Sequence, residues 1–120
     1  MARPVDWSSL GYSSDPIPGE PTRVDLFGRQ YIGTADAIYR AVGNLTAALK
    51  PEFGQSDAVD AVREAAGDVA RRIAKAETRY RGVGDAMVAY AAQLTTAQAD
   101  SLTALTSADA ARTSASSARN

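Results

Sequence analysis

A repeating pattern of apolar side chains between Asp57 and Tyr80 constrains the fold of this chain more than any other feature. The apolar residues recur at alternating steps of three and four, without interruption. They are Val59, Val62, Ala66, Val69, Ile73, Ala76 and Tyr80. This spacing is the a/d seam of a coiled coil, and so narrow a seam on an otherwise polar helix requires a partner helix. We therefore predict a helix that begins at residue 57 and buries its seam, including Val62 and Ile73, against a second helix.

A second seam of the same kind lies between Pro21 and Leu49. Two columns of residues, each with a period of seven, run side by side along it. They are Val24, Tyr31, Ile38 and Leu45, and beside them Gly28, Ala35, Val42 and Leu49. Pro21 suits the first position of a helix, because the N–H that it lacks would have no partner there. Gly28 lies in the seam, where the absent side chain would let a partner backbone approach closely.

The segment 50–56 is the expected turn between these two helices. Pro51 prevents the first helix from continuing, and Ser56 is a good N-cap for the second. A connection this short makes the two helices antiparallel neighbours. The sequence thus predicts an all-α fold: an antiparallel helical hairpin domain over 21–112, with helices at 21–49 and 57–112.

The second helix is expected to be long, and either continuous or kinked. No proline follows Pro51, and the pair Gly82 and Gly84 forms a weak point at 82–84. A bend at that point, folding the remaining segment back as a third helix, is the alternative. Residues 113–120, which are rich in serine and alanine, are expected to be a flexible tail.

The first 20 residues, rich in proline and glycine, are expected to form an extended arm. Trp7 either packs over the helices, the interpretation we favour for a lone tryptophan, or stands exposed as an anchor for a partner. The apolar face beyond residue 85 is too long for the first helix to cover. We expect another chain, a helical partner or a second copy, to complete it. The candidate contact residues are Trp7, Tyr90, Leu94, Leu102 and Leu105.

Composition argues against several classes of function. The chain has 120 residues, enough for one small domain, and its 13 basic and 14 acidic side chains nearly cancel, so nucleic acid is not an expected partner. It has no histidine and no cysteine, which removes the commonest general base and the commonest metal ligands. No apolar run approaches the roughly 20 residues of a membrane helix, and the opening lacks the apolar region of a cleaved signal peptide. We predict no catalytic residue, cofactor, metal or membrane insertion.

A basic column occupies one side of the second helix. It consists of Arg71, Lys75 and Arg79. The column is either a solvated face or a surface that meets an acidic partner. We favour the solvated face, because Asp68 can pair with Arg72 and Glu77 with Arg81 at helical spacing.

Blocks of residues near both ends of the chain resemble a known family. The N-terminal block comprises Arg3-Pro-Val-Asp-Trp7 and Ser14-Asp-Pro-Ile-Pro-Gly-Glu-Pro21. The later block runs from Tyr80 to Tyr90, followed by Leu94 and Ala97-Gln-Ala-Asp100. Together they resemble the N-terminal type VII secretion signal domain, related to the WXG100 proteins, of actinobacterial polymorphic and RHS-type toxins.

The resemblance implies a non-enzymatic secretion-targeting domain that pairs with a small WXG100-like helical partner. It also implies synthesis in the cytoplasm, secretion by a type VII-like route without a cleaved signal peptide, and a toxin domain in longer homologues. The candidate targeting residues are Asp15, Pro16, Pro18, Gly19 and Pro21, with Phe53 and Gly54 near the turn where the family carries Trp-x-Gly. The alternative is a self-associating structural or chaperone-like helical protein that is not exported.

Overall fold

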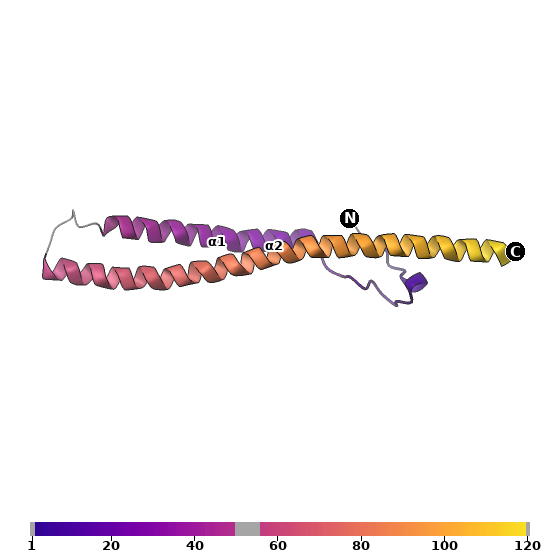
Figure 1. Cartoon of the computed structure of the whole chain (residues 1–120), viewed down its shortest axis with the longest axis horizontal. Coiled ribbons are helices and arrows are strands. Elements are labelled where there is room, and N and C mark those ends of the chain that lie inside the picture. The colour runs from indigo at the N-terminus through magenta and orange to yellow at the C-terminus, as the bar shows by residue number, and fades with distance from the viewer. Residues whose placement is uncertain (1, 50–55, 120) are drawn as a thin grey trace. The chain divides into compact units, whose positions relative to one another are not determined.

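The computed structural model describes residues 2–49 and 56–119. A short 3₁₀ helix, η1 (Ser8–Leu10), precedes two α-helices, α1 (Pro21–Ala48) and α2 (Asp57–Arg119), and the described residues include no strand. Figure 1 shows α1 lying antiparallel to the first part of α2. The predicted all-α hairpin with a long second helix is confirmed. The turn residues Phe53 and Gly54 lie outside the described residues.

Local sequence signals set the starts of both helices. Pro21 is the first residue of α1, and the carbonyl oxygen of Glu20 accepts the backbone N–H of Arg23 at 3.1 Å. Ser56 Oγ accepts the backbone N–H of Val59 at 3.1 Å, which is the bond that an N-cap makes. Ser56 therefore caps α2 as predicted.

α2 runs without a break through Gly82 and Gly84 to Arg119. A fold-back at this point is thereby excluded. The expectation of a flexible tail also needs correction, because residues 113–119 continue the helix with exposed side chains. No proline interrupts α2, and its many alanines favour a helix. Threonines in it, such as Thr95 and Thr103, donate their hydroxyls to the carbonyl four residues earlier, so these hydroxyls are satisfied within the helix.

The chain forms two compact units. The hairpin unit, Val24–Ala89, holds most of α1 and the first part of α2. The arm unit, Met1–Arg23 with Tyr90–Asn120, holds the arm and the rest of α2.

The helices of the hairpin unit meet along columns with a period of seven. On α1 the predicted seam holds except at Tyr31, which is exposed: Gly28 and Ala35 are buried, and the other seam residues are half-buried. On α2 one predicted column is half-buried at Val59, Ala66 and Ile73. The second column is formed by Arg63, Ala70, Glu77 and Gly84. Val62 is 62% exposed and Val69 is 48% exposed, so the prediction that their column is buried is wrong.

A close approach of two backbones explains this change of column. A Cβ atom on Gly84 would lie 2.6 Å from the carbonyl oxygen of Gly28, which is nearer than non-bonded atoms come. Contact this close requires small residues to face α1, and Gly84 and Ala70 supply them. Gly84 and Ala70 face α1. Val62 and Val69 belong to the column that precedes theirs by one residue in the sequence, so these valines face outward.

A polar link closes one side of the hairpin unit. Arg81 Nη2 donates to Asp36 Oδ1 of α1 at 2.9 Å, and Arg81 Nε donates to Glu77 Oε2 at 3.0 Å. These bonds, first the one to Glu77 and then the one to Asp36, raise the pKa of Arg81. The predicted pair of Glu77 with Arg81 is confirmed. Asp68, in contrast, pairs with Arg71 rather than with Arg72.

Candidate functional site

Trp7 is the central apolar residue of the arm, with only 1% of its surface exposed. Its indole Nε1 donates to the carbonyl oxygen of Pro4 at 2.8 Å. The backbone carbonyl oxygen of Trp7 accepts the N–H groups of Leu10 and Tyr12, and these bonds close the turn of the chain at η1. Gly11 ends this turn at φ 82°, in the left-handed region that favours glycine. Trp7 is thus buried within its own chain, as the favoured interpretation expected.

Arg3 ties the two sequence blocks of the arm together. Its Nε and Nη2 donate to the two carboxylate oxygens of Asp15 at 2.7 and 3.0 Å, a bidentate pair. The guanidinium also lies over the indole ring of Trp7, 5.0 Å from the ring centroid, within the range of a cation–π contact. One arginine therefore links Asp15 to Trp7.

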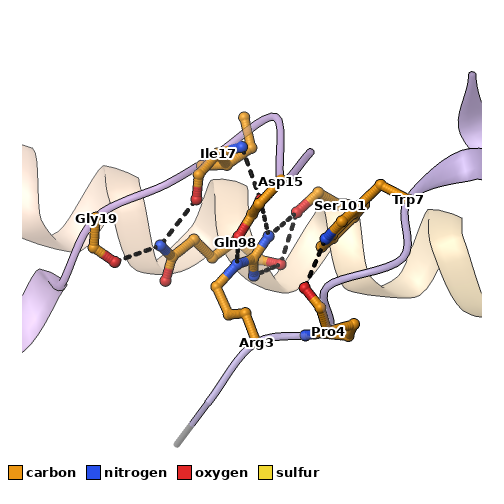
Figure 2. Close-up of polar contacts among 8 residues, drawn as sticks. All are labelled: Arg3, Pro4, Trp7, Asp15, Ile17, Gly19, Gln98 and Ser101. Carbon is orange, nitrogen blue, oxygen red and sulfur yellow. Dashed lines mark hydrogen bonds and ion pairs between the residues drawn. The ribbon is translucent and has the colours of Figure 1, made fainter. Parts of the chain in front are cut away.

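The same arginine fastens the arm to α2. Arg3 Nη1 donates to the carbonyl oxygen of Gln98 at 2.9 Å, and Nη2 donates to Ser101 Oγ at 2.8 Å. Figure 2 shows the guanidinium between the carboxylate of Asp15 and this turn of α2. We call the set Arg3, Asp15, Gln98 and Ser101 the clasp.

Gln98 holds the arm at a second point. Its side-chain Nε2 donates to the carbonyl oxygens of Ile17 and Gly19, at 3.0 and 2.9 Å, so one amide satisfies two arm carbonyls (Figure 2). Gly19 has φ 124°, and a Cβ there would lie 3.3 Å from Leu94 Cδ2. The arm thus lies directly on Leu94 at a position where the backbone conformation favours glycine.

Hydrogen bonding and charge favour the ionised clasp. The bond that Asp15 accepts from Arg3 lowers the pKa of this carboxyl below its ordinary value, against an opposing effect of desolvation. The same bond raises the pKa of Arg3. Asp6 also has a lowered pKa, because its Oδ1 accepts both the hydroxyl and the backbone N–H of Ser8. The arm therefore carries two carboxylates that folding holds in their charged form.

Weaker polar contacts attach η1 farther along α2. Ser9 Oγ donates to Asp109 Oδ1, and Arg112 Nη1 lies 3.4 Å from the hydroxyl oxygens of Ser8 and Ser9. The arm thus follows α2 from Leu94 to Arg112.

The arm unit covers more of the predicted contact face than the sequence suggested. Leu94 is 7% exposed and Leu105 is 3% exposed, and Trp7 is buried with them in the same unit. In this conformation these three residues support the fold of the chain itself. Tyr90 and Leu102 remain exposed, Leu102 at 39%. Of the five predicted contact residues, only these two are therefore available to a partner.

The predicted targeting residues mainly make contacts that shape the chain itself. Asp15 belongs to the clasp, and its Oδ1 also accepts the backbone N–H of Ile17 at 2.9 Å. Pro16 is half-buried and Pro18 is exposed, while Pro21 begins α1. The block thus forms the bend between the arm and the first helix.

Sequence reasoning missed Arg3, Gln98 and Ser101 as a group. A signal was present in the second half of α2, where the columns Ala91, Gln98, Leu105 and Leu94, Ser101, Ala108 are buried or half-buried with a period of seven. Polar residues in otherwise apolar columns indicate a polar partner in a packed interface. That partner is the arm.

The hairpin unit carries an open hollow lined mainly by apolar and aromatic side chains. Its volume is about 420 Å³, and it is lined by Phe27, Gln30, Tyr31, Thr34, Tyr80 and Met87. The rings of Tyr31 and Tyr80 lie across the two helices with centroids 5.8 Å apart. A second hollow, of about 290 Å³, lies near the turn and is lined by Ala48, Leu49, Ala58, Val59, Val62 and Arg63.

Within residues 2–49 and 56–119, no three acidic side chains gather closely enough to hold a metal ion. Neither helix, over its described residues, has a stretch long and apolar enough to cross a membrane. Comparison with protein-family models, with curated proteins and with solved structures finds no match to this chain.

Proposed function

We propose that this chain is a non-enzymatic secretion-targeting and interaction domain that pairs with a small WXG100-like helical protein. The observation that carries the proposal is the number of large apolar side chains that the hairpin unit leaves exposed. They are Leu26, Phe27, Tyr31, Tyr39, Val62, Val69, Tyr80 and Val83. Their distribution over both helices supports the proposal, because one half of a helical bundle would expose apolar side chains in this way to the half that completes it.

The geometry of a two-helix hairpin supports this interpretation. Two helices share one interface, so each buries only a single stripe, and the remaining apolar surface needs further helices. In the hairpin unit that single interface is narrow because Gly28, Ala35, Ala70 and Gly84 fill it. The larger residues stand beside it, where a partner helix can reach them.

The fixed arm supports a role in recognition. The clasp presents the Asp15–Pro21 block in one conformation, with each guanidinium nitrogen of Arg3 and the side-chain nitrogen of Gln98 bonded. A recognition element gains affinity from such order, because less conformational entropy is lost on binding. The resemblance of this block to type VII secretion signal domains supplies the secretion role.

Co-expression tests the pairing. The chain would be produced alone and together with a WXG100-like protein encoded beside it, and both samples would be studied by sedimentation. We expect a one-to-one heterodimer. The alternative, a self-associating structural or chaperone-like protein, predicts a homodimer that ignores the second protein, and that result would refute the proposed pairing.

Export is tested separately in a host that has a type VII system and in a matched strain that lacks it. The proposal expects the chain in the culture medium of the first strain alone. A chain that binds its partner yet stays inside both strains would contradict the targeting role.

A further inference from the structure

The exposed valines of α2 form a stripe along the hairpin unit. Val62, Val69, Ala76 and Val83 follow one another at intervals of seven. All three valines are exposed, and Val62 is the most exposed of them. Residues at this interval lie on one side of a helix, so the stripe is continuous over three heptads. A stripe of this kind is the contact surface that α2 would offer to a further helix.

Two hollows of the hairpin unit, the one lined by Tyr31 and the one lined by Val62, lie along this side. Tyr80 and Met87, each four residues after a stripe position, face Phe27 and Tyr31 of α1 across the larger hollow. Val62 itself lines the smaller hollow together with Ala48 and Leu49 of α1. The stripe and the two hollows therefore make one surface. We call it the groove face, defined by Phe27, Tyr31, Val62, Val69, Tyr80 and Val83.

The outer border of the groove face is basic. Arg72 and Arg79 lie three residues after Val69 and Ala76, which places them beside the stripe, and Lys75 is one turn from Arg79. In the part of the chain that the structure describes, none of these three cations makes an ion pair. Asp68 and Glu77 do not neutralise them, because their partners are Arg71 and Arg81.

Asp68, seven residues before Lys75, shares this border and is paired with Arg71, whereas the other acidic residues of this part of α2 lie elsewhere. Glu64 and Asp85 come two residues after Val62 and Val83, a rotation of about 200° that places them on the far side of the helix. Glu77 turns toward Arg81 and Asp36 beside α1. The border of the groove face is therefore positive even though the whole chain has a formal net charge of −1.

We propose that the groove face binds one amphipathic helix of a different protein, with an apolar stripe that packs into the groove and glutamate or aspartate at the positions flanking it. Charge identifies this occupant. A second copy of the chain would bring the same basic border to the same surface, and like charges would oppose each other. The inference rests on the proposed function in one respect: the proposed function supplies a helical partner, and the inference names the surface and the charge by which that partner is held.

Two synthetic helices test the inference on the full chain. Each has about 28 residues, four heptads, with leucine and isoleucine at a and d. One carries glutamate at the e and g positions, and the other carries lysine there. Calorimetric titration should show the glutamate helix binding at least about tenfold more tightly, with an advantage that shrinks as salt is added. Equal affinity for the two helices would overturn the inference.

Charge reversal at the border provides the second arm of the test. In a variant with Arg72→Glu and Arg79→Glu, preference should switch to the lysine helix. The matched control, Arg40→Glu with Arg119→Glu, changes the net charge equally, but Arg40 lines a different hollow and Arg119 ends α2. The control should keep the preference for glutamate. A switch in the control, or none in the border variant, would overturn the inference.

The apolar stripe is tested with Val69→Asp against Leu26→Asp. Both residues are exposed, so neither change should disturb the fold, which circular dichroism checks in each variant. Val69→Asp should abolish binding of the glutamate helix and Leu26→Asp should not. A homodimer of the unmodified chain that dissociates on Val69→Asp would overturn the inference, because it would make a second copy the occupant.

Failure of this inference is distinguishable from failure of the proposed function. If a WXG100-like protein binds and is exported with the chain, but Val69→Asp leaves that pairing intact, the groove face is not its site and only this inference fails. If the glutamate helix binds at the groove face while no WXG100-like protein does, the proposed function fails and this inference stands.

Discussion

Gly28 and Gly84 touch backbone to backbone where α1 crosses α2. A Cβ atom on Gly28 would lie 2.9 Å from the carbonyl oxygen of Gly84 and 3.0 Å from Met87 Cβ. This contact sets how close the helices come and which column of α2 turns inward. Gly84, one of the two glycines that were expected to weaken α2, therefore makes the closest contact between the two helices.

Gly84→Ala should destabilise the hairpin by about 1–3 kcal/mol, because the added methyl group collides with backbone atoms that cannot move aside. Gly82→Ala is the matched control in the same helix, since nothing lies within 4 Å of a Cβ there. It should stabilise the chain by up to about 1 kcal/mol through helix propensity. Denaturant unfolding measures both values. Effects of the same sign would show that the contact does not set the packing.

Ile73→Ala and Val62→Ala test the column that faces α1. Ile73 is half-buried in the interface, so its truncation should reduce the free energy of unfolding by roughly 1–3 kcal/mol. Val62 is 62% exposed, so Val62→Ala should change the free energy of unfolding by no more than about 0.5 kcal/mol. Chemical denaturation compares them. A larger loss of stability for Val62→Ala than for Ile73→Ala would show that the column with Val62 is buried against α1 after all.

Leu94→Ala should weaken the arm unit by about 2–4 kcal/mol, because Leu94 is 7% exposed and lies against Gly19. Leu102→Ala, on the same helix but 39% exposed, should have an effect of about 0.5 kcal/mol or less. Hydrogen exchange at the backbone N–H groups of Leu10 and Tyr12, both bonded to Trp7, reports opening of the arm. Equal exchange in the two variants would mean that Leu94 does not hold the arm.

Acid should release the arm. The lowered pKa of Asp15 means that its bond with Arg3 contributes stability above the unfolded pKa of about 3.9, and that this contribution is lost as the pH falls through the lower folded value. Asp6 acts in the same direction. Because Trp7 is the one tryptophan and is buried, its emission should shift to the red in this acidic range.

Asp15→Asn should give the released emission already at neutral pH, since the amide cannot form the charged bidentate pair. Asp6→Asn serves as the control, because Asp6 bonds to Ser8 and not to Arg3. It should keep the emission of the buried ring at neutral pH. Unchanged emission in Asp15→Asn would show that the clasp does not hold the tryptophan in place.

Chelation of divalent metal should leave the thermal unfolding of the chain unchanged. The sequence offers neither histidine nor cysteine as a ligand, and the acidic groups at the clasp and the hairpin link are bonded to arginines. Scanning calorimetry with and without EDTA measures the midpoint. A clear fall on chelation, reversed by one added metal, would reveal a bound ion.

Periodicity was enough to predict both helices and their pairing, because apolar spacing is a local property of the chain. It also gave the α1 seam and the cap at Ser56. It did not determine which α2 column faces α1, since Val62 and Val69 are more apolar than Ala70 and Gly84. Hydrophobicity favoured the valines, but the close approach of two backbones selected the smaller residues.

The clasp could not be predicted from the same kind of pattern. The columns with a period of seven mark Gln98 and Ser101 as polar positions in a packed face, but they do not identify Arg3, 95 positions from Gln98, as their partner. The favoured prediction that Trp7 is buried within the chain is confirmed. The path of the arm along α2 depends on donors and acceptors matched in three dimensions, which one sequence does not reveal.

The distance along the chain between the two sides of the clasp determines the order of assembly during translation. The arm leaves the ribosome before either helix, but its binding site between Leu94 and Arg112 is made only after the whole hairpin. α1 and the first part of α2 can pair as soon as both are synthesised, whereas closing the far larger loop to Arg3 must wait. Until that moment a nascent chain lacks the surface that buries Trp7, so the indole is accessible to any protein that arrives before α2 is complete.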